Sequence, residues 1–212
     1  MSEFHFKTKL DQTILLGRRA KNAEELLKGV REVPDASIYY HTHRFLQQHN
    51  YLSPEPPNDF AYWSSEMLND VVLGEQLWSI DVIQYTRIAE LRQAFVDVLS
   101  DHVKSKGGTR EVPEGGDFYF MAARTFVLST QHIAHSLAEF RHILRDVSVS
   151  SLYYHMFDAR LRLKTTGQND FSNWFREMGK ERLAEETANL DPYSHTLEGL
   201  RKRILVLTER YE

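Results

Sequence analysis

The sequence contains no cysteine. Disulfides, thiolate zinc sites, iron–sulfur clusters and cysteine nucleophiles are therefore excluded. It also lacks any apolar run close to the roughly 18 residues that a membrane-spanning helix needs. The first residues carry neither the basic region nor the apolar region of a signal peptide. We therefore expect a protein with no membrane partner.

An excess of charge of one sign is also missing. The 212 residues include 26 Lys and Arg against 30 Asp and Glu, which gives a net charge of -4. This mildly acidic balance argues against a general nucleic-acid-binding protein. With 42% hydrophobic residues the chain has enough apolar side chains for a globular core. Its length fits one domain, or two of about 100 residues each.

The common catalytic motifs are absent as well. The sequence has no phosphate-binding loop, dinucleotide-binding glycine motif, nucleophile elbow or H-E-x-x-H zinc motif. These absences leave the question of enzymatic activity open and point to no particular cofactor.

An internal repeat organises the chain. Residues 4–41 align with residues 118–155 without a gap, and ten of the 38 aligned pairs are identical. After a short gap, Asn58-Asp59-Phe60 matches Asn169-Asp170-Phe171, and Trp63 matches Trp174. The order of the matches never breaks, so we predict two homologous halves. Both tryptophans are expected in the core.

A segment rich in glycine and charge separates these halves. Residues 102–116 contain four glycines and a proline, a composition typical of linkers. We predict a first repeat over residues 1–101, a linker over 102–116 and a second repeat over 117–212.

Each half is predicted to be mainly α-helical. Asn22 and Ser136 are each followed three residues later by a glutamate, Glu25 or Glu139, which is the pattern of a helix N-terminal capping box. Further helices are expected from Ser37 and Ser151, after Asn58 and Asn169, before Asp81 and Asp191, and over residues 87–103 and 196–210. The apolar–polar alternation at residues 4–16 and 118–128 favours a short strand at the start of each half, although a helix is not excluded. Such strands could pair across a pseudo-twofold axis that relates the halves.

His41 and His155 are matching residues of the repeat and the main chemical candidates. Each lies on the helix face expected to contact the core, so a buried histidine bonded to a backbone group or a carboxylate is the favoured interpretation. The alternative is that both line a ligand or metal pocket near the pseudo-axis. His41 and His43 point about 200° apart on a helix and cannot share one ion.

A second candidate region surrounds the proline-rich segment Ser53–Pro57, where the two halves differ most. It is either a stiff connection into a helix cap or one wall of a binding site. Arg160, near His155, could bind a carboxylate or phosphate, or could hold the halves together. The predicted ligand-binding residues are His41, His43, Arg44, His49, Glu55, Asp59, His155 and Arg160.

Several long motifs resemble an uncharacterised prokaryotic family, a domain of unknown function. They are the segment from Ser37 to Leu46, the segment from Ser53 to Trp63, Asn169 to Ser172, and Leu190 to Tyr193 with Thr196 to Glu198. The resemblance covers nearly the whole chain. It implies a cytoplasmic bacterial or archaeal protein, and it supplies no reaction and no catalytic residues.

Three functional hypotheses follow from these patterns. The first is a non-catalytic module that binds a small molecule or a protein partner, or that regulates another protein. The second is a metal-dependent enzyme with a site around His41, His43, Asp59 and His155. The third is a structural homodimer.

Overall fold

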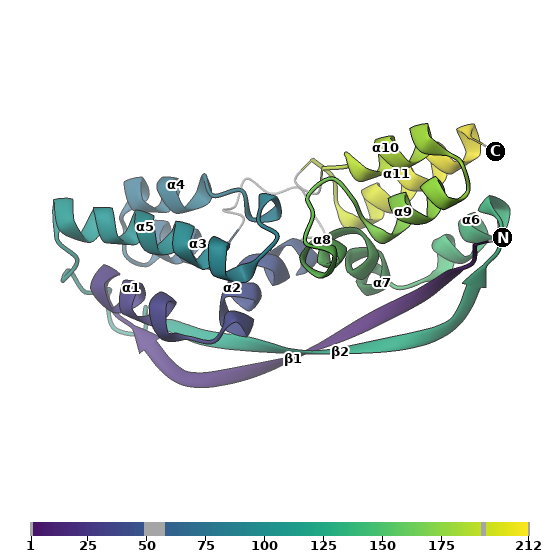
Figure 1. The fold of residues 1–212 in the computed structure, drawn as a ribbon. Coiled ribbons are helices and arrows are strands. Elements are labelled where there is room, and N and C mark those ends of the chain that lie inside the picture. Colours follow the sequence, from purple (N-terminus) through teal and green to yellow (C-terminus); the bar gives the residue numbers. More distant parts are fainter. Residues whose placement is uncertain (1, 49–57, 192–193, 212) are drawn as a thin grey trace. The chain divides into compact units, whose positions relative to one another are not determined.

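The computed structural model describes residues 2–48, 58–191 and 194–211, with the side chains of residues 45–48 left out (Figure 1). The first half of the chain begins with strand β1 (Phe4–Ala20). The elements that follow are helices α1 (Ala23–Glu32), α2 (Asp35–Gln48), α3 (Asp59–Glu66) and α4 (Val71–Trp78), the 3₁₀ turn η1 (Val82–Gln84) and helix α5 (Ile88–Lys106).

The second half again starts with a strand, β2 (Phe118–Ala134). Its helical elements are α6 (Leu137–Asp146), α7 (Val149–Tyr153), the π-helical segment η2 (Tyr154–Asp158), α8 (Ala159–Leu163), α9 (Asp170–Glu177), α10 (Glu181–Ala188) and α11 (Leu197–Arg210). The prediction of a mainly α-helical protein is therefore confirmed. No helix among the described residues is both long enough and apolar enough to span a bilayer.

The predicted helix caps are present. The side chain of Asn22 accepts a hydrogen bond from the Glu25 N–H (2.9 Å), and that of Ser136 accepts one from the Glu139 N–H (3.2 Å). Each glutamate carboxylate then accepts from the N–H of the residue before the cap, Lys21 or His135. The glutamates thus reach one residue further back than the standard capping box requires.

The strands at the start of the two halves pair with each other in a two-stranded antiparallel sheet, with arrowheads at opposite ends in Figure 1. Each strand has 17 residues, so the prediction of short strands was wrong in length. The predicted alternation holds at Phe4 and Phe6, which are buried. It fails at Leu10, which is exposed while Lys9 is buried, because Lys9 forms an ion pair in the interior.

The chain forms two compact units, and each unit contains segments from both halves of the sequence. Unit 1 comprises the described residues within 1–10, 47–53 and 125–212, and unit 2 those within 11–46 and 54–124. Each strand therefore contributes its first part to one unit and its last part to the other. The predicted division at residues 102–116 separates the chain into consecutive halves. The units instead group segments that pack together, whichever half they come from.

The core of unit 2 is closed by the beginning of β2. Phe118 lies against the ring of Phe60 in α3 at a centroid distance of 5.3 Å, and Phe120 is fully buried among the helices of the first half. Trp63 is buried as predicted, and its indole N–H donates to the carbonyl of Gly116 (2.7 Å).

The core of unit 1 is closed in the same way by the beginning of β1. Phe4 and Phe6 contact Phe140 of α6 at centroid distances of 5.7 and 5.3 Å. Trp174 of α9 is buried as predicted, and its indole N–H donates to the carbonyl of Ser2 (3.2 Å). In each unit, aromatic residues of a strand from one sequence half complete the core of helices from the other half.

The predicted linker is ordered against unit 2. Helix α5 extends into it as far as Lys106, and Gly107 then adopts a φ of 75°. The carbonyl of Gly108 accepts from the Glu24 N–H (3.1 Å), and the Val112 N–H donates to the Lys21 carbonyl (2.8 Å). These bonds hold the segment against the start of α1.

We expect that Gly29→Ala destabilises the protein, although alanine usually favours a helix over glycine by about 1 kcal/mol. A Cβ at position 29 would lie 2.1 Å from Cζ of the buried Phe120 ring. Overpacking of this kind costs about 1–3 kcal/mol. Urea denaturation of the two proteins measures the difference. Gly167→Ala adds the same methyl group where no atom lies within 4 Å, and an equal loss of stability in that control would contradict the expectation.

Candidate functional site

His41 lies on α2 in unit 2, with only 2% of its surface exposed. Its Nδ1 atom is 2.8 Å from Oδ2 of Asp59, the first residue of α3. Its Nε2 atom accepts a hydrogen bond from the backbone N–H of Met121 in β2 (2.9 Å). The ring therefore joins two helices of the first half to the strand that begins the second half.

His155 makes the same three-part connection in unit 1. Its Nδ1 atom is 2.7 Å from Oδ2 of Asp170, the first residue of α9. Its Nε2 atom accepts from the backbone N–H of Lys7 in β1 (2.8 Å). The ring is 3% exposed.

These contacts determine the proton positions on both rings. A nitrogen that accepts an N–H must present its lone pair, so Nε2 is unprotonated and the ring proton lies on Nδ1. That N–H donates to the aspartate carboxylate, which orients the ring. In this arrangement neither ring offers a free lone pair to a metal ion or to a substrate proton. The favoured prediction of buried histidines bonded to a backbone group and a carboxylate agrees with this geometry.

Unit 1 contains features at this position that unit 2 lacks. The helix that carries His155 changes to π-helical geometry over Tyr154–Asp158, whereas α2 is a regular helix around His41. Segments of π-helix are frequent at functional sites. In addition, Nη2 of Arg162 donates to Oδ2 of Asp170 (2.6 Å). The guanidinium of Arg162 lies 4.4 Å from the centre of the Tyr154 ring, a contact that Arg44 also makes with the matching Tyr40 in unit 2.

The π-helical segment also brings a buried ion pair into unit 1. Nζ of Lys9 lies 2.7 Å from Oδ2 of Asp158, with 1% of the lysine side chain exposed. Buried charges are tolerated when they are paired in this way. Arg160, a predicted ligand-binding residue, is buried nearby, and its Nη2 atom is 3.5 Å from the Ala188 carbonyl. The Lys9–Asp158 pair and the Arg160–Ala188 contact thus lie within unit 1.

A pocket of about 310 Å³ opens beside His155. Its lining includes His155, Asp170, Arg162, Lys7 and Trp174. Among the described residues, the ammonium group of Lys7 forms no ion pair, while Arg162 is held by Asp170. The pocket combines a cation, an aromatic edge, a carboxylate–guanidinium pair and the carboxylates of Glu3 and Glu177, a set of groups suited to a small polar ligand.

The protonation properties of this pocket follow from its burial. Burial lowers the pKa of the His155 imidazole below its ordinary value of 6.5, and the hydrogen bond to Asp170 opposes this effect. The nearby cations Arg162 and Lys7 lower the pKa further. Burial also raises the pKa of the Tyr154 hydroxyl. Both groups are therefore held in their neutral forms.

The remaining predicted site residues do not gather at this pocket. His43 is buried, with its Nδ1 atom 2.9 Å from the Thr42 hydroxyl and its ring stacked on Tyr39. Arg44 donates to the Thr13 hydroxyl and lies over the Tyr40 ring, also within unit 2. His49 and Glu55 lie outside the described residues, as does the proline segment Ser53–Pro57.

Asp170 and Arg162 are the site residues that the sequence-based list omitted. The signal for Asp170 was present, because Asn58-Asp59 and Asn169-Asp170 are matching residues of the repeat. Asp59 is among the predicted site residues, and its match in the repeat points to Asp170. The preceding asparagines, Asn58 and Asn169, cap the two helices. Over residues 2–48, 58–191 and 194–211, no group of three or more metal-ligating side chains is placed to hold an ion.

Comparisons with known proteins agree with the resemblance seen in the sequence. The sequence profile of DUF5752, described as a family of unknown function, matches residues 1–209. The solved structure of OrfY from Thermoproteus tenax superposes with a TM-score of 0.82 and 28% sequence identity, covering 100% of this chain and 96% of that one. No curated protein matches the chain.

We expect the stability of the protein to decrease as the solution becomes more acidic than about pH 6.5. The folded pKa of His155 lies below the ordinary value of 6.5, so the unfolded chain takes up the proton first. The contribution of His155 to stability is therefore complete above 6.5 and is lost as the pH falls toward the folded pKa. Urea denaturation at successive pH values measures this loss. An NMR titration in which the His155 ring titrates at or above 6.5 would contradict it.

Proposed function

The chain belongs to DUF5752, and we propose that it is a non-catalytic ligand-binding or regulatory module. One observation carries this proposal: both ring nitrogens of His41 and of His155 are engaged by a carboxylate and a strand N–H. A general base needs a free lone pair within reach of the substrate proton. The two most prominent chemical groups of the chain thus serve to hold strands to helices, and a metal-dependent reaction through them is not favoured.

We further propose that the two halves are duplicated copies in a pseudo-twofold arrangement. Strand, first helix and histidine recur at an offset of 114 residues, at Phe4 and Phe118, Ala23 and Leu137, and His41 and His155. The reciprocal use of the strands supports this proposal, because each half lends its strand to helices of the other. The chain segments 1–101 and 117–212 would then be the two copies, joined by residues 102–116.

The pocket beside His155 is the proposed ligand site. At the positions that match Lys7 and Arg162 at the offset of 114 residues, the sequence has Met121 and Gln48. Lys7 thus has no cation at its matching position, and it lies next to a π-helical segment that does not recur around His41. The shared framework forms in both copies, so it does not need groups that occur in only one of them. Such groups are consistent with a role in binding. Glu3 and Glu177 also line the pocket, so a small polar molecule whose acidic group contacts Lys7 fits these groups.

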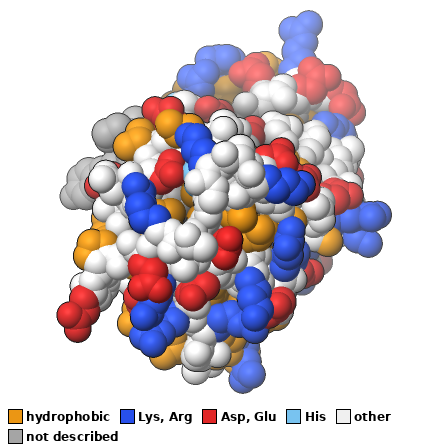
Figure 2. All heavy atoms as spheres, turned by 90° about the vertical axis from the view of Figure 1, so that its left-hand side faces the viewer, with side chains coloured by type: hydrophobic (Ala, Val, Ile, Leu, Met, Phe, Trp, Pro, Cys, Tyr) orange, Lys and Arg blue, Asp and Glu red, His pale blue; other side chains and the backbone are white. Residues whose placement is uncertain are grey.

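The surface charge favours small molecules or protein partners over nucleic acid. On the face shown in Figure 2, Lys and Arg side chains alternate with Asp and Glu and form no continuous basic field. A nucleic-acid-binding surface gathers cations along one face to neutralise phosphates. The cytoplasm of a prokaryote is the proposed setting.

We expect Lys7→Ala to weaken ligand binding while leaving the protein folded. The backbone N–H of Lys7, which bonds to His155, is unchanged by the substitution, and only the ammonium group at the pocket is lost. A thermal-shift screen of anionic metabolites identifies ligands, and titration calorimetry then compares affinities, with a loss of about tenfold expected for one charge-assisted contact.

Lys202→Ala, which removes an exposed cation from α11, is the matched control. Equal weakening by both substitutions would place the ligand elsewhere. Turnover of any substrate that disappears in His155→Gln would overturn the non-catalytic assignment.

A structural homodimer is a second candidate, favoured by exposed apolar side chains on β2. Phe126, Val127 and Leu128 follow one another with exposed fractions of 44%, 49% and 49%. A strand with exposed apolar residues and an unpaired edge is suited to association with another strand.

If this strand mediates dimerisation, light scattering at micromolar concentration will give twice the chain mass of 24.8 kDa. Val127→Lys will then return the protein to the single-chain mass, because a charge is costly to bury at an apolar contact. Arg203→Ala, a change at an exposed site on α11, serves as the control. The single-chain mass in the unchanged protein would exclude the homodimer.

A further inference from the structure

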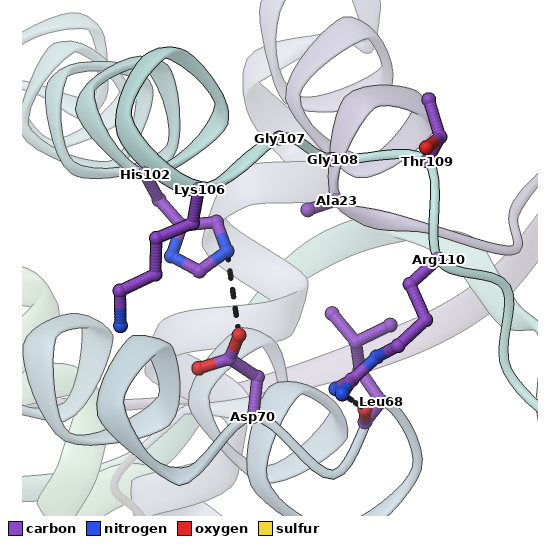
Figure 3. A pocket seen from close by; sticks show the side chains of 9 residues that line it. All are labelled: Ala23, Leu68, Asp70, His102, Lys106, Gly107, Gly108, Thr109 and Arg110. Atoms are coloured by element: carbon purple, nitrogen blue, oxygen red, sulfur yellow. Dashed lines mark hydrogen bonds and ion pairs between the residues drawn. The ribbon is translucent and has the colours of Figure 1, made fainter.

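A second pocket lies entirely within unit 2 and has no part in the function proposed above. It encloses about 320 Å³ between the start of α4, the end of α5 and the connecting segment from Gly107 to Arg110 (Figure 3). A cavity of this size matches the smaller ligand sites of proteins.

An aspartate and a histidine form the inner part of this pocket. Nε2 of His102 lies 3.4 Å from Oδ2 of Asp70, and the side chains are 5% and 20% exposed. The other carboxylate oxygen of Asp70 accepts from the Leu73 N–H (2.9 Å) at the start of α4. The carboxylate of Asp70 thus contacts the imidazole and the positive end of a helix.

Two cations flank this pair and have no carboxylate of their own. Lys106 follows His102 by one helical turn on α5, and Arg110 lies on the opposite side of Asp70 in Figure 3. The guanidinium of Arg110 donates to the Leu68 carbonyl, which uses only part of its hydrogen-bonding capacity. Within the described part of the chain, neither side chain forms an ion pair with a carboxylate. The pocket therefore has an excess of positive charge.

Glycines fix the position of the segment that carries Arg110. Gly107 has a φ of 75°, a conformation that other residues rarely adopt. A Cβ at Gly108 would lie 2.7 Å from Cγ of Glu24 and 2.9 Å from Cγ2 of Val103. The connection is therefore closely packed against α1 and α5, and the guanidinium of Arg110 is held by the Leu68 carbonyl. Such preorganisation lowers the entropic cost of binding.

The second half of the chain has different chemistry at the matching positions. Lys180 occupies the N-cap of α10, where Asp70 occupies that of α4. Nζ of Lys180 donates to the Tyr211 carbonyl near the end of α11. In unit 1, a cation bonded to the backbone thus replaces the Asp70–His102 pair.

We propose that this pocket binds a small anion, the phosphate or carboxylate group of a compact metabolite, with Lys106 and Arg110 as its cationic ligands. Phosphate and carboxylate both accept charge-assisted hydrogen bonds from ammonium and guanidinium groups. The carboxylate of Asp70 accepts from the N-terminus of α4 and faces His102, which limits its repulsion of the anion.

The test uses the full chain with inorganic phosphate and with succinate as separate probes. Titration calorimetry at low ionic strength is expected to show saturable binding of at least one probe, and the stronger one identifies the preferred acid group. Lys106→Ala and Arg110→Ala are each expected to weaken that binding about tenfold. The NMR signals of Gly107 and Gly108 are expected to shift on titration in the unchanged protein.

Lys104→Ala is the matched control, because Lys104 lies on the same helix and pairs with Asp101 at its surface. It removes one positive charge from the last turns of α5 without altering the pocket. Retained binding in this variant, together with loss in the other two, supports the site. Absence of saturable binding of either probe, or equal weakening by Lys104→Ala, overturns it. Failure of this site leaves the pocket beside His155 unaffected, because none of these residues lines that pocket.

Discussion

The hydrogen bond from a strand N–H to a histidine Nε2 atom is the contact on which the architecture depends. It occurs twice, from Met121 to His41 and from Lys7 to His155. Because the opposite ring nitrogen is held by an aspartate at the start of a helix, the imidazole cannot rotate away from the strand. Each bond attaches a strand of one sequence half to helices of the other, where phenylalanines of the strand close the core.

This arrangement explains why the chain separates into units that do not follow its linear halves. A strand edge carries unpaired backbone groups, and a helical layer with an apolar face needs a cover. The two strands pair with each other, which bonds their backbone groups. In each unit, the strand from one sequence half also covers the apolar face of helices from the other half. Phe120 and Phe6 each pack on helices of the other sequence half. A change at either residue therefore affects helices that are far away in the sequence.

Against this shared framework, the two units differ in polar groups. Unit 1 contains the Lys9–Asp158 pair, the π-helical segment and the Arg162–Asp170 contact, whereas unit 2 contains the Asp70–His102 pair with Lys106 and Arg110. The structural histidines are common to both units, so the two binding sites we propose rest on the groups that differ. The similarity to OrfY from Thermoproteus tenax extends over 100% of this chain, which makes that protein suitable for the same binding experiments.

Local chemistry in the sequence determined the helices, their caps and the strands. Asn22 and Ser136 cap helices because a side-chain oxygen three residues before an N–H needs no tertiary context. Alternating apolar residues identified the strands, and the matching of His41 with His155 singled out the two important rings. The partners of those rings depended on the tertiary structure alone. Lys7 and Met121 contribute only backbone N–H groups, which every residue except proline possesses, so no pattern of side chains marks them. Asp70 and Arg110 likewise come together only because the connecting segment from Gly107 to Arg110 packs against α1. This packing results from the close fit of the segment there, and its composition does not predict it.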